Sequence, residues 1–206
     1  FLPPYGNGVL TEPALQVTHV DGNTSTELHY IGHRTENLNG GISQTVISLK
    51  DPAYPFTVEI YIKSYADNSM MEIWKIVLHR FASASPVLKA KEYWLTQFAG
   101  NYKREATISE EQLSEGIKIL DSKLGVRAHQ MRIPSFILSL NGPAQENAGE
   151  VLAASLRWSG SFQFAFDVDW NKNLRLITGM NPLGSQYYLE RGGTFTTPAI
   201  LYAYSK

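Results

Sequence analysis

The chain has 206 residues, enough for one large domain or two small ones, and its 43% hydrophobic and 18% charged residues are typical of a folded globule. A formal net charge of −1 with no basic run gives no electrostatic basis for binding nucleic acid or an anionic membrane. The lack of cysteine excludes disulfides, thiolate metal sites and cysteine nucleophiles. No apolar run approaches the roughly eighteen residues that cross a bilayer, and the opening "FLPPYGNG" carries no signal-peptide pattern that would indicate a compartment.

Hydrophobic residues recur with a period of two along most of the chain, which is typical of β-strands. We expect strands at 15–20, 26–31, 45–49, 56–63, 70–81, 134–140, 149–158, 161–170, 174–179 and 195–204. In 161–170, three phenylalanines, a valine and a tryptophan alternate with polar residues or alanine. Residues 70–81 are apolar on both faces, which predicts a central strand covered on both sides or a strand that passes between sheets.

Turn sequences separate these strands. "VDGNTS", "DWNKNLR" and "WSGSF" are expected to form hairpin turns, whereas "KDPAYP", "NGPAQENAG" and "NPLGS" are expected to be looser loops. The one helical candidate is "SEEQLSEG", where Ser109 and Gln112 could form a capping box over one or two turns. No linker divides the chain. We therefore predict an all-β fold, a single large antiparallel β-sandwich domain that covers residues 1–206.

Asp167 and Asp169 stand two apart in "FAFDVDWNKN" and are the first candidates for catalysis. Retaining glycosidases need two carboxyl groups about 5–5.5 Å apart that flank the scissile bond from opposite sides. Carboxylates two apart on one strand instead point in parallel, about 6–7 Å apart between their Cα atoms. We interpret this pair as part of the solvated outer face of a strand.

Other chemical motifs are weaker. No two of the five histidines are spaced as H-x-H, and we predict no metal site. Ser159 lacks the G-x-S-x-G elbow and its following helix, and the glycines of "NGPAQENAGE" lack phosphate-loop spacing. We expect no catalytic residues, no metal and no cofactor in this chain.

Aromatic side chains leave a binding function open. Tyr187 and Tyr188 adjoin, as do Tyr93 and Trp94, so one of each pair points away from a strand's core face unless a second layer covers it. One hypothesis is therefore that the chain is a free-standing carbohydrate-binding module that stacks sugars on Trp94, Trp158 or Tyr188. A purely structural or adhesive sandwich is another.

Four segments, in order, resemble bacterial family 36 α-galactosidases. "YGNGVLTEPALQVTHVDGNTSTELHYIGHR" resembles their Y-G-x-G/T…P-A-L-Q-V…D-G-x-x-x-T-x-L-x-Y…H-R segment. "GNYKREATISEEQLSEGIKILDSKLGVRAHQMRIPSFILSL" resembles G-x-W-x-R-E and the stretch to P-F-x-x-L, and "GEVLAASLRWSGSF" resembles G-E-V-Y-G-F-S-L-x-Y-S-G-N-F. "GMNPLGSQYYLERGGTFTTPAILYAYS" resembles G-I-N-P…P-G-E-x-F-x-T-P-E-x-V-L-x-Y-S.

The resemblance implies the N-terminal β-supersandwich of these enzymes, which precedes a (β/α)8 catalytic barrel. The family's nucleophile is the Asp of a K-W-D-x-N motif on a barrel strand. "DVDWNKN" lacks the lysine and reverses the order of Trp and Asp. The chain is therefore expected to be inactive alone, as a non-catalytic part of a retaining α-galactosidase that releases terminal α-linked galactose from sugars of the melibiose or raffinose type.

The implied partner is the catalytic barrel of the same parent chain, with a homo-oligomer as a further expectation and galactosides bound only through the parent enzyme. Candidate contacts with the barrel are Arg127 and His129, in a loop with Gly125, and Asn181, in a loop with Pro182. The alternative role for these residues is local: Asn181 and Pro182 can make a turn, and His129 can fill a strand edge.

Overall fold

The computed structural model describes residues 15, 17–19, 21–76, 82–84, 88–100, 106–122, 133–183, 187–190 and 192–206. Within these ranges the chain is all-β, as predicted, with no helix. The strands are β1 (His29–Leu38), β2 (Ile42–Lys50), β3 (Thr57–Tyr65), β4 (Met70–Ile76), β5 (Ala82–Ala84), β6 (Leu88–Lys89), β7 (Tyr93–Gly100), β8 (Ala106–Gln112), β9 (Gly116–Asp121), β10 (Ser135–Gln145), β11 (Ala148–Leu156), β12 (Phe162–Val168), β13 (Asn173–Met180) and β14 (Ile200–Ser205).

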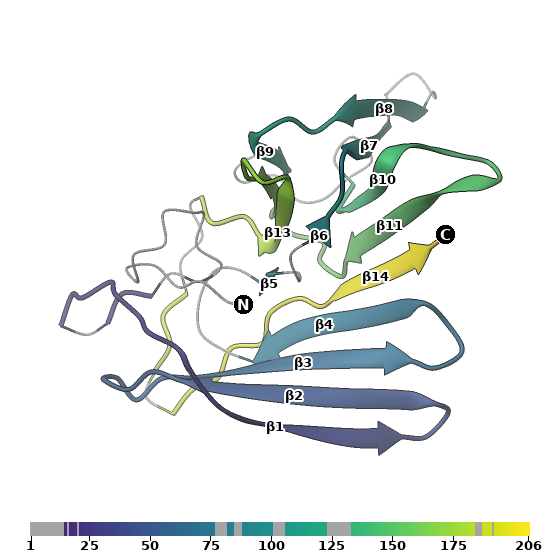
Figure 1. Cartoon of the computed structure of the whole chain (residues 1–206). Helices are drawn as coiled ribbons and strands as arrows, with labels where there is room; N and C mark the ends of the chain where they lie inside the picture. Colours follow the sequence, from purple (N-terminus) through teal and green to yellow (C-terminus); the bar gives the residue numbers. More distant parts are fainter. Residues whose placement is uncertain are drawn as a thin grey trace.

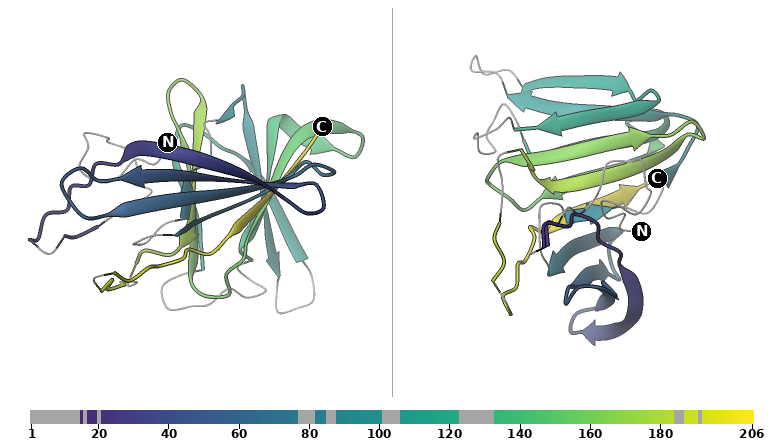
Figure 2. Two further views of the ribbon diagram at one scale, coloured as in Figure 1. Left: turned by 90° about the horizontal axis from the view of Figure 1, so that it is seen from below. Right: turned by 90° about the vertical axis from the view of Figure 1, so that its left-hand side faces the viewer.

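These strands form two antiparallel sheets. The larger sheet has nine strands in the order β1-β2-β3-β4-β14-β11-β10-β7-β8, and the smaller has the order β5-β13-β12-β9, with β6 also paired to β13. In Figure 1 the smaller sheet lies beside the half of the large sheet that contains β7 and β10, while β1 to β4 extend away from it. The large sheet is strongly twisted, so that its strands fan out when viewed from below (Figure 2).

The chain passes repeatedly between the two sheets. After β1 to β4 it enters the small sheet at β5 and β6, returns for β7 and β8, crosses again for β9, and continues in this manner to β14. Both expectations for residues 70–81 are therefore met in part. β4 lies inside the large sheet and has buried residues on both faces, with Glu72 on one and Ile73 and Lys75 on the other. The next described strand, β5, belongs to the small sheet.

The core lies between the sheets and is rich in phenylalanine. Alternation along β12 directs Phe162, Phe164 and Phe166 into it, as the period of two predicts. From the large sheet, Phe136 on β10 meets Phe164 and Phe166 edge to face, with ring centroids 5.2 and 5.0 Å apart. Edge-to-face pairs of this kind stabilise a core beyond the area that they bury. This aromatic cluster holds the two layers together.

The short helix predicted within 109–116 is wrong. Residues 109–112 belong to β8, where Thr96 pairs with Glu110 and Trp94 with Gln112. The polar sequence "SEEQ" offers a good capping pattern, but cross-strand hydrogen bonds with β7 outweigh this local preference. Leu113, which follows, is buried in the core.

Four other sequence predictions differ from the structure. Residues 17–19 form no strand, and the described part of "VDGNTS", residues 21–25, makes a tight turn without paired strands on both sides. The expected loop at 141–149 is instead a hairpin, because β10 continues to Gln145 and β11 begins at Ala148, with a register shift where Asn141 and Gly142 have positive φ. "WSGSF" is not a hairpin turn, since it joins β11 of the large sheet to β12 of the small one.

Candidate functional sites

Asp169 builds the turn between β12 and β13. Its Oδ1 accepts a hydrogen bond from the backbone N–H of Asn173 at 2.8 Å, and its Oδ2 accepts one from Asn173 Nδ2 at 2.8 Å. Lys172 takes a positive φ of 61° and donates its N–H to the Asp169 carbonyl. This is the hairpin turn that the sequence predicts, with the carboxylate acting as its local hydrogen-bond acceptor.

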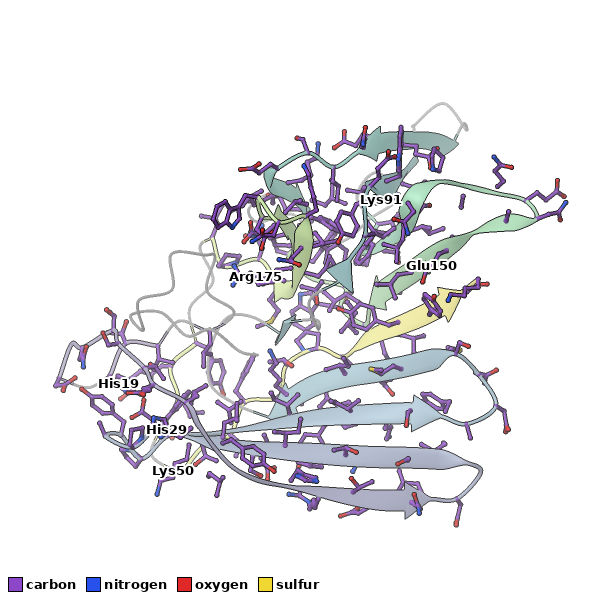
Figure 3. The ribbon with its side chains drawn as sticks, in the orientation of Figure 1. His19, His29, Lys50, Lys91, Glu150 and Arg175 are labelled. Atoms are coloured by element: carbon purple, nitrogen blue, oxygen red, sulfur yellow. The ribbon has the colours of Figure 1, made fainter. Side chains whose placement is uncertain are left out.

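Asp167 faces the opposite side of β12 from the phenylalanine core. Its Oδ2 lies 3.2 Å from Nη2 of Arg175, which stands directly opposite on β13 and is labelled in Figure 3. Only 16% of each side chain is exposed, and Gln163 and Ala165 on the same face are buried. The expectation of a solvated outer face is therefore wrong for Asp167, because the carboxylate is paired with Arg175 and lies beside the buried Ala165 and Ile177.

The two carboxylates consequently have separate structural partners. Asp167 neutralises Arg175 across a strand pair, and Asp169 closes a turn. The geometry supports the interpretation that this is not a glycosidase acid/base pair.

The outer face of the β1–β4 region carries a ladder of aromatic and charged side chains. Tyr61 and Trp74 stack at 5.1 Å, with Arg34 over Tyr61 and Lys63 over Trp74. Tyr61 Oη donates to Glu59 at 2.7 Å; this bond and the neighbouring Arg34 lower the pKa of the Glu59 carboxyl despite partial burial. Because each ring stacks on the other and also lies within 6.0 Å of a cation, we assign this pair to stabilising the sheet rather than to binding a sugar.

The tryptophans proposed as sugar platforms also have local roles. Trp158 Nε1 donates to the Ser161 carbonyl, and its indole lies so close to Gly160 that a Cβ there would be 2.6 Å from Nε1. Trp94 Nε1 donates to Glu92. In contrast, 85% of Tyr188 is exposed, as is 79% of Trp170, which the sequence pattern placed on the core face of its strand. Trp170 instead lies in the turn after β12.

Asn181, one of the candidate barrel contacts, is fully buried at the end of β13. Its Oδ1 accepts the N–H of Leu183 at 3.0 Å, so the local turn role holds, while its Nδ2 has no hydrogen-bond partner among the described residues. Pro182, beside it, is half-buried. The other candidates, Gly125, Arg127 and His129, lie outside the described residues.

A cavity of about 440 Å³ was not foreseen from the sequence. It lies between residues 17–19 and 21 on one side and 54–56 on the other, and its walls include His19, Asp21, Tyr54 and Phe56. His19 and Tyr54 stack with ring centroids 3.5 Å apart. The sequence predicts a loose loop at "KDPAYP". In the structure Asp51 Oδ1 accepts the N–H of Ala53, two residues on, which is an Asx turn. Because Asp favours such turns, Asp51 is the signal that could have indicated a fixed loop.

Neither a metal site nor a membrane span stands out in the described part of the chain. It contains no cluster of three His, Cys, Asp or Glu side chains that could hold a metal ion. Nor does it include a helix of the length and hydropathy that crossing a bilayer requires.

Comparison with known proteins gives a consistent result. The family model of the glycosyl hydrolase family 36 N-terminal domain matches residues 1–190. The α-galactosidase AgaA of Geobacillus stearothermophilus is 27% identical over 98% of this chain and 31% of its own length. The crystal structure of the Geobacillus stearothermophilus GH36 α-galactosidase AgaB matches with a TM-score of 0.86 at 26% identity, over 98% of this chain and 31% of that one. The α-galactosidase structure from Lactobacillus brevis matches with a TM-score of 0.86 at 23% identity, over 99% and 30%.

Proposed function

Because the chain belongs to glycosyl hydrolase family 36, as the N-terminal domain found in its α-galactosidases, we propose that it is the non-catalytic domain of a retaining enzyme that removes terminal α-linked galactose from oligosaccharides of the melibiose or raffinose type. The observation that supports this proposal is how much of this chain and of its relatives the matches cover. Nearly the whole chain matches, yet it spans only about a third of the length of the relatives that it matches. The remaining two thirds would contain the catalytic residues.

Packing on a catalytic barrel is the physical role that we assign to the domain. The connection between β13 and β14 supports it, because this segment presents Leu183, Tyr187 and Tyr188 to solvent within six residues. Large apolar side chains gathered in one irregular segment are typical of a surface that another domain covers. Asn181 stands at its start, and its buried side chain fixes the turn there by accepting the N–H of Leu183.

Support for oligomerisation is the second part of the proposed role. β1 is an edge strand of the large sheet and pairs only with β2 among the described residues. Tyr30 and Ile31 on β1 are largely exposed, and a register shift lies between Tyr30 and Gly32. An exposed edge with apolar side chains favours contact with a second chain. We assign the contact between copies of the enzyme to this edge.

The proposal is tested on the longer polypeptide that it requires. We expect the reading frame to continue past Lys206 into a catalytic domain, and the polypeptide to hydrolyse p-nitrophenyl α-galactoside with initial release of the α-anomer. Changing Tyr188 to alanine in that polypeptide should lower its melting temperature by several degrees, because a desolvated tyrosine at a domain contact stabilises it by about 1–2 kcal/mol.

The matched control is Trp170→Ala, which removes an aromatic of similar exposure from a turn and should leave the melting temperature unchanged. In the isolated 206-residue domain, Tyr188→Ala should also have no effect. A reading frame that ends at Lys206 would refute the assignment. A whole enzyme in which Tyr188→Ala and Trp170→Ala behave alike would refute the docking surface alone.

A further inference from the structure

The cavity lined by residues 17–19, 21 and 54–56 has the properties of a small-molecule site. Its volume of about 440 Å³ falls in the range of roughly 300–1,000 Å³ that is typical of ligand pockets. Its wall is mainly apolar, with Val17, Pro55 and Phe56, and a single carboxylate, Asp21, stands at it. Figure 3 shows His19 on the segment that leads into β1, at the same end of the sheet as Lys50, the last residue of β2. We propose that this cavity binds one pyranose unit of a galactoside.

The cavity is formed before any ligand arrives, because a buried carboxylate fixes the loop that carries Tyr54 and ties it to Glu27, in the segment that follows Asp21. Asp51 is almost fully buried; its Oδ1 accepts the N–H groups of Ala53 and Tyr54, and its Oδ2 accepts the N–H of Glu27. Burial alone would raise the pKa of Asp51, but these three backbone donors outweigh it and lower the pKa. A preformed site avoids the entropy of ordering two loops when a weakly bound sugar enters.

Tyr54 is held in place at the cavity by three neighbours. Its ring stacks on His19, its hydroxyl donates to Asp21 Oδ2 at 2.8 Å, and Asn23 Nδ2 donates to the same hydroxyl at 2.8 Å. The N–H of Asn23 also donates to Asp21 Oδ1. Each oxygen of Asp21 therefore accepts one hydrogen bond from the protein, and a carboxylate has further acceptor sites for two more.

These groups match the two kinds of surface that a pyranose presents. Hydroxyl groups on adjacent carbons can donate to the two oxygens of Asp21, whose pKa is lowered by the Asn23 N–H and the Tyr54 hydroxyl, so that the carboxylate stays ionised at neutral pH. The apolar C–H faces of the ring can pack on Pro55 and Phe56. A quaternary ammonium would need several ring faces turned toward it, whereas one face of Tyr54 is already closed by His19.

The site is separate from the role in packing, and its failure would leave that role intact. It does not use Asn181, Tyr188 or the β13–β14 connection. Only the choice of galactosides among pyranosides rests on the proposed function. In an enzyme that cleaves galactosides, such a site would hold a second sugar unit or a second substrate molecule at a distance from the reaction.

The test is titration of the 15N-labelled 206-residue chain with methyl α-galactoside and with raffinose, up to 100 mM, followed by NMR. We expect the amide signals of His19, Asp21 and Tyr54 to shift with saturation and a millimolar Kd. Thr18→Trp, which places an indole in the cavity from an exposed position, and Asp21→Asn, which removes the charge while keeping the shape, should each weaken binding at least tenfold.

The matched control is Asp67→Asn, which removes a carboxylate from the exposed turn between β3 and β4 and should leave the Kd unchanged. Thermal unfolding of each variant confirms that the fold is kept. The proposal is overturned if these amide signals do not move, if they move equally in Thr18→Trp, or if choline shifts them and the galactosides do not.

Discussion

Replacing Lys75 with methionine should stabilise the domain more than any other single change that we identify. Lys75 lies on β4 with 3% of its surface exposed, and its Nζ has no hydrogen-bond partner among the described residues. Burial lowers the pKa of this amine to about 7. Methionine has similar length and no charge to desolvate, so we expect the free energy of unfolding at pH 7 to rise by roughly 2–4 kcal/mol.

The same lysine should make stability depend on pH. In the unfolded chain Lys75 keeps its proton up to about pH 10.4, whereas in the folded domain it loses it near pH 7. Between these values the unfolded state binds more protons, so stability rises with pH, and the destabilisation by Lys75 is greatest below pH 7. Tyr61 and Tyr65, whose pKa values burial raises, act in the opposite direction near pH 10.

Chemical denaturation between pH 6 and pH 9 measures both effects. The difference in unfolding free energy between Lys75→Met and the natural sequence should shrink steadily as the pH rises. Lys91→Met is the control, because Lys91 is exposed beside β7; it should change stability by less than about 0.5 kcal/mol at every pH. A Lys75→Met variant that is less stable than the natural sequence at pH 7 would show that Nζ has a partner that stabilises its charge.

Phe136→Ala should have the largest destabilising effect. Phe136 is fully buried on β10 and contacts Phe164 and Phe166 of the opposite sheet edge to face. Its removal leaves a cavity at the centre of the contact between the layers, and we expect a loss of about 3–5 kcal/mol in unfolding free energy. Urea denaturation of the isolated domain measures this loss directly.

The controls for Phe136 separate cavity formation from the loss of an aromatic ring. Phe136→Leu keeps most of the volume and should lose about 1–2 kcal/mol. Trp170→Ala removes a larger ring from an exposed position and should change stability by less than about 0.5 kcal/mol. Equal effects of Phe136→Ala and Trp170→Ala would mean that the phenylalanine cluster does not hold the sheets together.

The buried strands of the sandwich were predictable because their side chains alternate. Phe162, Phe164 and Phe166 identify β12 and its core face from sequence alone, and the Asx turn at Asp169 identifies the hairpin that follows. Edge and corner strands were not predictable in this way. β8 ends in "SEEQ" and is an edge of the large sheet, so little apolar burial shapes its sequence, and a helix-capping pattern remained the strongest local signal.

The candidate sites also differ in how far the sequence alone predicts them. The pairing of Asp167 with Arg175 follows from the register of one hairpin and was within reach of the sequence. The burial of Lys75 could also have been read from its alternation with Ile73, which faces the core. The cavity could not, because it joins His19 and Asp21 to Tyr54 across more than thirty residues, and only the folded sheet brings those loops together.

The most direct test of the account is an assay of the isolated 206-residue chain with p-nitrophenyl α-galactoside, beside its Asp167→Asn and Asp169→Asn variants. Because these carboxylates form an ion pair and a turn, all three proteins should release nitrophenol at the rate of the buffer blank. Turnover by the natural sequence that either substitution abolishes, in a variant that still folds, would place catalysis in this chain and contradict the account.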